Sequence, residues 1–191
     1  MNWDMRKRQK YLNSQNEGGQ KMKKIISVIE LLSEYSGKIA YYLIIPLTLV
    51  VFYTVIMRRF FGSYPEWGFE VTIFLFGIMI LLIGAETLRI KGHISVDIIQ
   101  NYIKGTAAKI LSVFICLIII GISLLMFLKG IDLSIESTMI QERSAHQTSF
   151  NPTIWWFKWF IPIGAFLLLL QSLVELFKLI TKKGDKNGTD I

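Results

Sequence analysis

The chain has 191 residues, of which 52% are hydrophobic and 18% are charged, and its formal net charge at pH 7 is +7. Its apolar residues gather in four runs of about 20 residues, and a chain this short has too little polar sequence to cover them in water. The composition therefore excludes a soluble globular domain.

The four apolar runs predict the fold class. About 20 helical residues cross ~30 Å of hydrocarbon, and backbone groups in lipid must be paired within the chain. We therefore predict an all-α integral membrane protein with four transmembrane helices and interfacial amphipathic helices. The predicted spans, within a membrane domain over 22–180, are residues 39–57, 69–88, 107–128 and 155–176.

The N-terminal segment divides into two parts. Residues 1–21 are polar and rich in Asn, Gln and Lys, which predicts a disordered, basic cytoplasmic tail. Residues 23–36 carry apolar side chains at helical spacing, so they either lie in the inner interface as an amphipathic helix or extend the first span. A cleavable signal peptide is not expected, because Glu30 and Glu34 interrupt the apolar stretch and no A-x-A-like site follows.

The distribution of positive charge predicts the orientation. Sixteen of the 21 Lys and Arg residues precede the first span, flank the loop between spans two and three, or follow the last span. The positive-inside rule therefore puts both termini, including the tail over 181–191, in the cytoplasm. Nucleic-acid binding is the competing explanation of the charge, but the basic tail lacks interleaved aromatic residues or a binding motif. The tryptophans predicted at the outer interface are Trp67, Trp155, Trp156 and Trp159.

Glu70, Gly77 and Gly84 recur every seven residues in the second span, so they share one helix face. Two glycines on a face allow a neighbouring helix to approach closely, which predicts either a helix contact within the chain or an interface with a partner subunit. For Glu70, an ion pair with Arg58 or Arg59 across the short hairpin is favoured over a role in proton relay or ion binding.

The stretch "RIKGHISVD" follows the second span and holds His93 and Asp97 four residues apart. The following residues, 94–103, predict a short interfacial helix on the cytoplasmic face. His93 and Asp97 could ligate a metal together, but two ligands do not make a site, and no metal is expected. We expect this stretch, which begins at Arg89, to anchor the cytoplasmic end of the span and to turn the chain into the interfacial helix, with His93 capping or positioning the turn.

The remaining polar features are a long external loop and a small cluster. The loop, residues 129–154, is predicted to be exposed where an extracytoplasmic partner would dock. Gln171, Glu175 and Lys178 follow one another at helical spacing and predict a helix contact. Cys116 is the single cysteine, so no intramolecular disulfide is possible.

No nucleophile elbow, P-loop, zinc-protease motif, inverted repeat or pair of broken helices occurs. We therefore predict no enzyme activity and no cofactor, and the sequence favours an accessory membrane subunit. An integral membrane enzyme using His93 and Asp97, and a small homo-oligomeric channel or exporter with Glu70 in its pore, are the alternatives.

Several segments, taken in order, resemble a known family. They are "RRFFGSYPEWGFE", then Gly84, Ala85 and Arg89, then "GHISVD", and finally "WWFKWFIPIG". Together they resemble the DctQ-type small membrane subunit of tripartite ATP-independent periplasmic (TRAP) transporters, over residues 38–178. The chain departs from the family pattern at Phe69, where a second acidic residue is frequent, and at Gly62, where Asn is frequent.

The resemblance implies a non-catalytic scaffold beside a large membrane subunit that carries the substrate and sodium sites. It also implies a periplasmic binding protein as partner and sodium-driven uptake of an organic acid, such as a C4-dicarboxylate, keto acid or sialic acid. The structural or interface residues that we expect are Arg58, Arg59, Trp67, Glu70, Gly77, Gly84, Arg89, His93 and Asp97.

Overall fold

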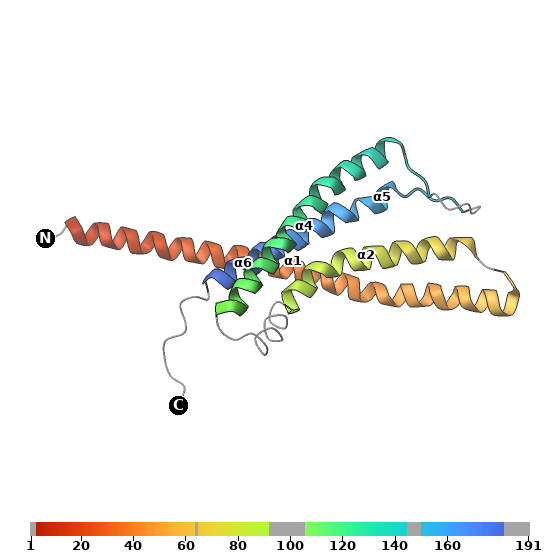
Figure 1. Cartoon of the computed structure of the whole chain (residues 1–191), viewed down its shortest axis with the longest axis horizontal. Coiled ribbons are helices and arrows are strands. Elements are labelled where there is room, and N and C mark those ends of the chain that lie inside the picture. Colours follow the sequence, from red (N-terminus) through yellow and green to blue (C-terminus); the bar gives the residue numbers. More distant parts are fainter. Residues whose placement is uncertain (1–2, 64, 92–105, 145–149, 182–191) are drawn as a thin grey trace, which may run out of the picture.

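The computed structural model describes residues 3–63, 65–91, 106–144 and 150–181. Its helices are α1 (Trp3–Phe61), α2 (Glu66–Lys91), α4 (Thr106–Met139), α5 (Trp155–Lys158) and α6 (Phe160–Thr181) (Figure 1). Four candidate spans, Met22–Phe61, Glu66–Ile90, Ile110–Met139 and Trp155–Thr181, are long and apolar enough to cross a membrane. The all-α prediction with four transmembrane helices is confirmed. The helix expected over 94–103 lies outside the described residues.

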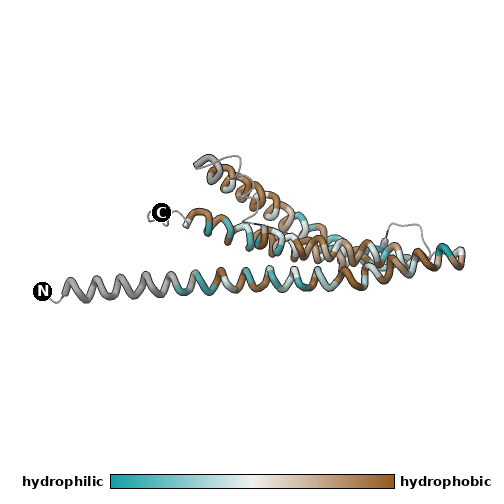
Figure 2. The backbone as a smooth tube through the Cα atoms, turned by 90° about the horizontal axis from the view of Figure 1, so that it is seen from below, coloured by the Kyte–Doolittle hydropathy of each residue, from teal (hydrophilic) through white to brown (hydrophobic). Residues whose placement is uncertain are grey.

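The helices form two antiparallel hairpins that cross each other (Figure 1). α1 packs against α2, α4 packs against α6, and α6 joins the hairpins by contacting both α1 and α2. We call the end that holds residues 86–91 and 175–181 the terminal end, and the end that holds residues 58–63, 65–67, 139–144 and 150–155 the loop end. Figure 2 shows α4 and α1 diverging from each other toward the terminal end, so the four spans do not close a ring.

α1 is a single helix from Trp3 to Phe61, and its N-terminal part projects beyond the other helices (Figure 1). Of the two alternatives for residues 23–36, the structure has the extension of the first span. Helix also covers residues 3–21, where the composition favoured a disordered tail. Polar residues without Pro allow a helix to propagate from a packed segment, although such an end gains little from tertiary contacts. The disorder of this tail in solution stays a prediction.

The polar end of α4 differs from the sequence-based expectation. The predicted loop over 129–154 is shorter, because α4 continues to Met139. The hydroxyl of Ser134 donates to the carbonyl oxygens of Gly130 at 2.7 Å and Lys158 at 3.0 Å. The hydroxyl of Thr138 donates to the Ser134 carbonyl at 2.6 Å. These hydroxyls are satisfied by backbone carbonyls, so the polar side chains are accommodated within α4, and the Ser134 bond to Lys158 also ties this part of α4 to α5.

Small residues set the approach of α6 to α2. A Cβ added at Gly164 would lie 2.5 Å from the carbonyl oxygen of Leu81, so only glycine fits beside this backbone. A Cβ at Gly77 would lie 2.5 Å from the ring of Phe157, and one at Gly84 would lie 4.0 Å from Leu168. The predicted glycine stripe therefore faces α5 and α6 of the same chain. Of the two readings of the stripe, this contact supports the one within the chain.

Substituting Gly164 tests this close approach. We expect Gly164→Ala to separate α2 from α6 and to lower the thermal unfolding temperature of the detergent-solubilised protein, because the added methyl group overlaps a backbone oxygen. Gly121→Ala is the matched control, since a Cβ at Gly121 meets nothing within 4 Å. Alanine is the better helix former by about 0.5–1 kcal/mol, so the control should be neutral or slightly stabilising. Equal effects of the two changes would contradict the packing.

Candidate functional site

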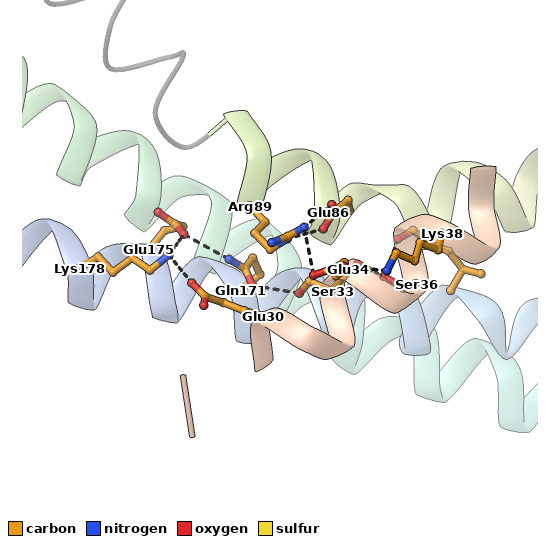
Figure 3. Close-up of polar contacts among 11 residues, drawn as sticks. Glu30, Ser33, Glu34, Ser36, Lys38, Glu86, Arg89, Gln171, Glu175 and Lys178 are labelled. Atoms are coloured by element: carbon orange, nitrogen blue, oxygen red, sulfur yellow. Dashed lines mark hydrogen bonds and ion pairs between the residues drawn. The ribbon is translucent and has the colours of Figure 1, made fainter. Parts of the chain in front are cut away.

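Polar side chains of the membrane domain gather in two clusters, one at each end of the spans. The terminal-end cluster joins α1, α2 and α6 (Figure 3). Its members are Glu30, Ser33, Glu34, Ser36, Lys38, Glu86, Arg89, Gln171, Glu175 and Lys178. The cluster lies where apolar spans meet polar sequence, so it marks one boundary of the membrane-embedded region.

One branch of the terminal-end cluster connects α1 to α6. Ser33 and Gln171 are fully buried, and the Ser33 hydroxyl donates to Gln171 Oε1 at 2.9 Å. Gln171 Nε2 donates in turn to Glu175 Oε1 at 3.2 Å. Lys178 Nζ lies 2.7 Å from Glu175 and 2.6 Å from Glu30. The branch satisfies buried polar groups that would otherwise destabilise the helix contact.

A second branch connects α1 to α2. Arg89 donates to Glu86 from Nε at 2.6 Å and from Nη2 at 2.7 Å. The same Nη2 lies 3.6 Å from Glu34 Oε2. Glu34 also pairs with Lys38 at 2.8 Å. Glu86 packs directly over Gly37, where a side chain would overlap its methylene groups. Arg89 thus ties the end of α2 to α1.

The carboxylates and cations of the terminal-end cluster neutralise one another. Its four carboxylates contact three cations, and each cation contacts at least one carboxylate within 4 Å. In the part of the chain that the structure describes, no group of three or more His, Cys, Asp or Glu is placed to hold a metal ion. Paired charges at a span boundary position helices, whereas a transport pathway needs charges that exchange partners.

At the loop end, Glu70 is 2% exposed and accepts a hydrogen bond from the Ser144 hydroxyl. The predicted ion pair with Arg58 or Arg59 is wrong for the described residues, where both arginines are exposed and neither contacts Glu70. The reason is geometric, because Glu70 shares the face of Gly77 and points toward the α4–α5 connection rather than toward α1.

The connection between α4 and α5 is held by backbone hydrogen bonds. Arg143 and Thr153 form an isolated antiparallel bridge. The Ser144 amide donates to the Pro152 carbonyl at 2.9 Å, and the Ile154 amide donates to the Glu142 carbonyl at 2.9 Å. The Phe150 amide donates to Glu66 Oε2 at 3.3 Å. We call residues 140–144 and 150–154 the bridged loop.

An ion pair closes the base of the bridged loop. Lys158 of α5 donates to Glu142, and both side chains are less than one-third exposed. The ammonium group of Lys158 holds the pKa of the Glu142 carboxyl below its ordinary value, because the hydrogen bond stabilises the charged form. The pair therefore stabilises the loop only while Glu142 is ionised.

Aromatic residues gather at the loop end, and the placement of the tryptophans at the outer membrane interface stays a prediction. Trp67 stacks on Tyr53 of α1, with ring centroids 5.6 Å apart, and so closes the first hairpin. Phe74 of α2 contacts Trp156 at a centroid distance of 5.2 Å. Trp159 Nε1 donates to the Thr138 hydroxyl at 3.1 Å, which joins α5 to the end of α4. Amphipathic rings with a bonded N–H are typical of a membrane interface.

The structure brings only some of the expected residues together. Glu70 and Gly77 face the second hairpin, Arg89 belongs to the terminal-end cluster, and Trp67 lies between α1 and α2. His93 and Asp97 lie outside the described residues. Sequence reasoning missed the partners of Gln171 and Lys178 on α1. The polar residues in an otherwise apolar helix were the available signal, but nothing in the sequence identified their partners.

The family model described as "Tripartite ATP-independent periplasmic transporters, DctQ component" matches residues 47–182, which include most of the four spans. No curated protein matches the chain.

A double-mutant cycle tests the buried bond between Ser33 and Gln171. We expect Gln171→Leu to lower the free energy of unfolding by about 1–2 kcal/mol, because the Ser33 hydroxyl loses its acceptor in a buried site. Once Ser33→Ala is present, the same change should cost less. Unfolding in mixed detergent micelles measures all four proteins, and strictly additive effects would contradict a direct interaction.

The Glu142–Lys158 pair predicts a pH-dependent difference between the wild type and Glu142→Gln. Because the folded-state pKa of Glu142 is lowered, its stabilisation is complete above the ordinary pKa of about 4.3 and is lost as the pH falls through the lower folded value. The two proteins should therefore differ in thermal stability at neutral pH and converge at acidic pH. A difference that is independent of pH would refute the ion pair.

Proposed function

We propose a scaffold role for this chain, which belongs to the DctQ component family of TRAP transporters. In this role, the large membrane subunit moves against it during sodium-driven uptake of an organic acid. Membership makes it the small membrane subunit, which is a non-catalytic transport component, and suggests a multi-pass protein of the inner membrane. The scaffold role, the sodium coupling, the class of solute and the docking of a binding protein are the proposed parts.

The scaffold role rests on one observation. The helices are arranged openly, and the middle of each described span carries no charged side chain. The spans do not close a ring, and α4 packs on α5 and α6 at one side. Residues 39–57, 71–85, 110–128 and 159–174 contain no Asp, Glu, Lys or Arg. A channel or a transport site would need polar groups lining a path at this depth. The arrangement therefore favours a scaffold over the self-contained channel and the membrane enzyme.

An exposed apolar face of α1 supports contact with the large subunit. Six exposed residues follow one another at alternating spacings of three and four along this face: Ile25, Val28, Leu32, Tyr35, Ile39 and Tyr42. Exposed apolar residues continue along α1 to Phe60. From Ile25 to Phe60 a helix rises ~52 Å, which is longer than the ~30 Å hydrocarbon core.

Lipid alone does not account for the whole of this face. To fit ~52 Å within the hydrocarbon, α1 would have to tilt by about 55°, beyond the usual range of 0–40°. The ion pairs of Glu34 and Lys38 also lie beside Tyr35, which favours a position at the membrane boundary. We infer that the large subunit covers the part of the face near the terminal end, while membrane lipids cover the rest.

The orientation follows from charge. Most of the Lys and Arg residues lie at or beyond the terminal end, which favours the cytoplasm for that end and for both termini. The loop end, with its tryptophans and bridged loop, then faces the periplasm. This is the side from which a binding protein would deliver an organic acid. Since the four runs named above, within the described spans, contain no Asp, Glu, Lys or Arg, we assign the sites for sodium and solute to the large subunit.

Reconstitution tests the proposal. We expect vesicles that hold this chain alone to take up none of a panel of labelled C4-dicarboxylate, keto acid and sialic acid. Vesicles that hold both membrane subunits, supplied with the binding protein and an inward sodium gradient, should accumulate one of these solutes. Uptake by this chain alone would overturn the scaffold role, and uptake by the complex without a sodium gradient would overturn the proposed coupling.

A further inference from the structure

Three carboxylates around the bridged loop form hydrogen bonds with the loop or with the helix that follows it. Glu70 is buried under the Ser144 hydroxyl, and Glu66 accepts the Phe150 amide. Glu142 is engaged by Lys158 at the base of the loop. Three acidic groups thus bond to the loop or to the helix that follows it. Glu70 is buried and Glu142 is paired with Lys158, whereas Glu66 stays exposed next to the Phe150 amide.

The positive charge of the bridged loop is turned outward. Arg143 is exposed, and among the described residues it forms no ion pair. Its backbone is fixed by the bridge to Thr153. Ile140 and Phe150, which are exposed large apolar residues, lie on the same two strands of the loop. Glu136, on the last turns of α4, is the exposed acidic residue nearest in sequence. The described parts of the loop therefore expose one cation and two large apolar side chains, and Glu66 is an exposed carboxylate that contacts the loop at the Phe150 amide.

The bridged loop is also ordered before any partner binds. The backbone bonds of Ser144 and Ile154 join its two segments, 140–144 and 150–154. Glu66 and Glu70 attach these segments to the first turns of α2. A surface that is already ordered loses less conformational entropy on association than a flexible loop does. Exposed charges on such a surface raise the rate of encounter with an oppositely charged partner.

We propose that the bridged loop docks an acidic surface of the binding protein through Arg143 and Phe150, and that Glu66 and Glu70 are positioning residues that hold the loop in place. The inference rests on the proposed docking role and adds the chemistry of the partner surface. A protein surface is favoured over an anionic lipid headgroup because Phe150 and Ile140 extend the cationic site with apolar area on an ordered loop.

The binding protein is isolated together with its native membrane subunits and is labelled with a fluorophore. Its binding to vesicles that hold the complete membrane complex tests the proposal. We expect Arg143→Glu to raise the dissociation constant on the order of tenfold at low salt, because attraction becomes repulsion. The difference should shrink at high salt, where exposed charges are screened. Lys129→Glu is the matched control, because Lys129 is an exposed cation that is paired with Asp132 on α4, and it should leave the constant unchanged.

The positioning role has its own readout. Glu70→Ala should increase hydrogen exchange at the amides of Ser144 and Ile154 and raise the dissociation constant. Once Glu70→Ala is present, Arg143→Glu should have a smaller effect, because the arginine is no longer held in place. Unchanged exchange in Glu70→Ala, or fully additive effects on binding, would overturn the positioning role.

A photo-crosslinker in place of Phe150 distinguishes the two levels of the inference. Crosslinking to the binding protein together with weaker binding of Arg143→Glu supports the proposal. Crosslinking with unchanged binding of Arg143→Glu overturns the charge-based recognition and leaves the docking role intact. An absence of crosslinking, with normal uptake by the same vesicles, overturns the docking role itself. Equal loss of binding in vesicles with and without anionic lipid is expected, and a loss confined to anionic vesicles would assign the arginine to lipid.

Discussion

The structure depends on one constraint, which is that a polar side chain taken out of water at the end of a span must find a partner there. Ser33 and Gln171 satisfy each other at the terminal end, and Glu70 meets the Ser144 hydroxyl at the loop end. Each bond joins elements that are distant in the chain. The polar residues therefore fix which helices lie together at the two boundaries. The apolar middle of each span provides the packing surface between these boundaries.

The same constraint explains how an open helix arrangement remains defined. The apolar surface of one span is no more attracted to another span than to lipid tails, so hydrophobicity alone does not choose neighbours. Close backbone approach at Gly164 and paired charges around Arg89 supply that choice. As a result, large faces of α1 and α4 remain exposed without loss of the fold, and such faces are what a subunit that works beside a larger partner requires.

Local sequence patterns predicted those features of the structure that depend on a short segment alone. The length of the apolar runs predicted the four spans, and the seven-residue stripe through Gly77 predicted a helix contact. The tryptophans predicted a membrane interface at the end of the spans where they lie. The sequence was less informative where polar residues continue a helix. Ser134 and Thr138 bond to backbone carbonyls, so α4 extends into sequence that resembles a loop. The partner of Glu70 was missed because Arg58 and Arg59 lie on α1, whereas Glu70 of α2 meets Ser144 in the α4–α5 connection.

The sequence by itself determined the fold class, the family resemblance and the positions of the polar residues, because hydrophobic length and residue spacing are properties of a short segment. Only the tertiary structure decided which polar residues meet. Ser33 and Gln171 are 138 positions apart, and Glu70 and Ser144 are 74 positions apart. Each polar residue in a span has several chemically suitable partners, and the crossing of the two hairpins, rather than any local pattern, brings one of them within hydrogen-bonding distance.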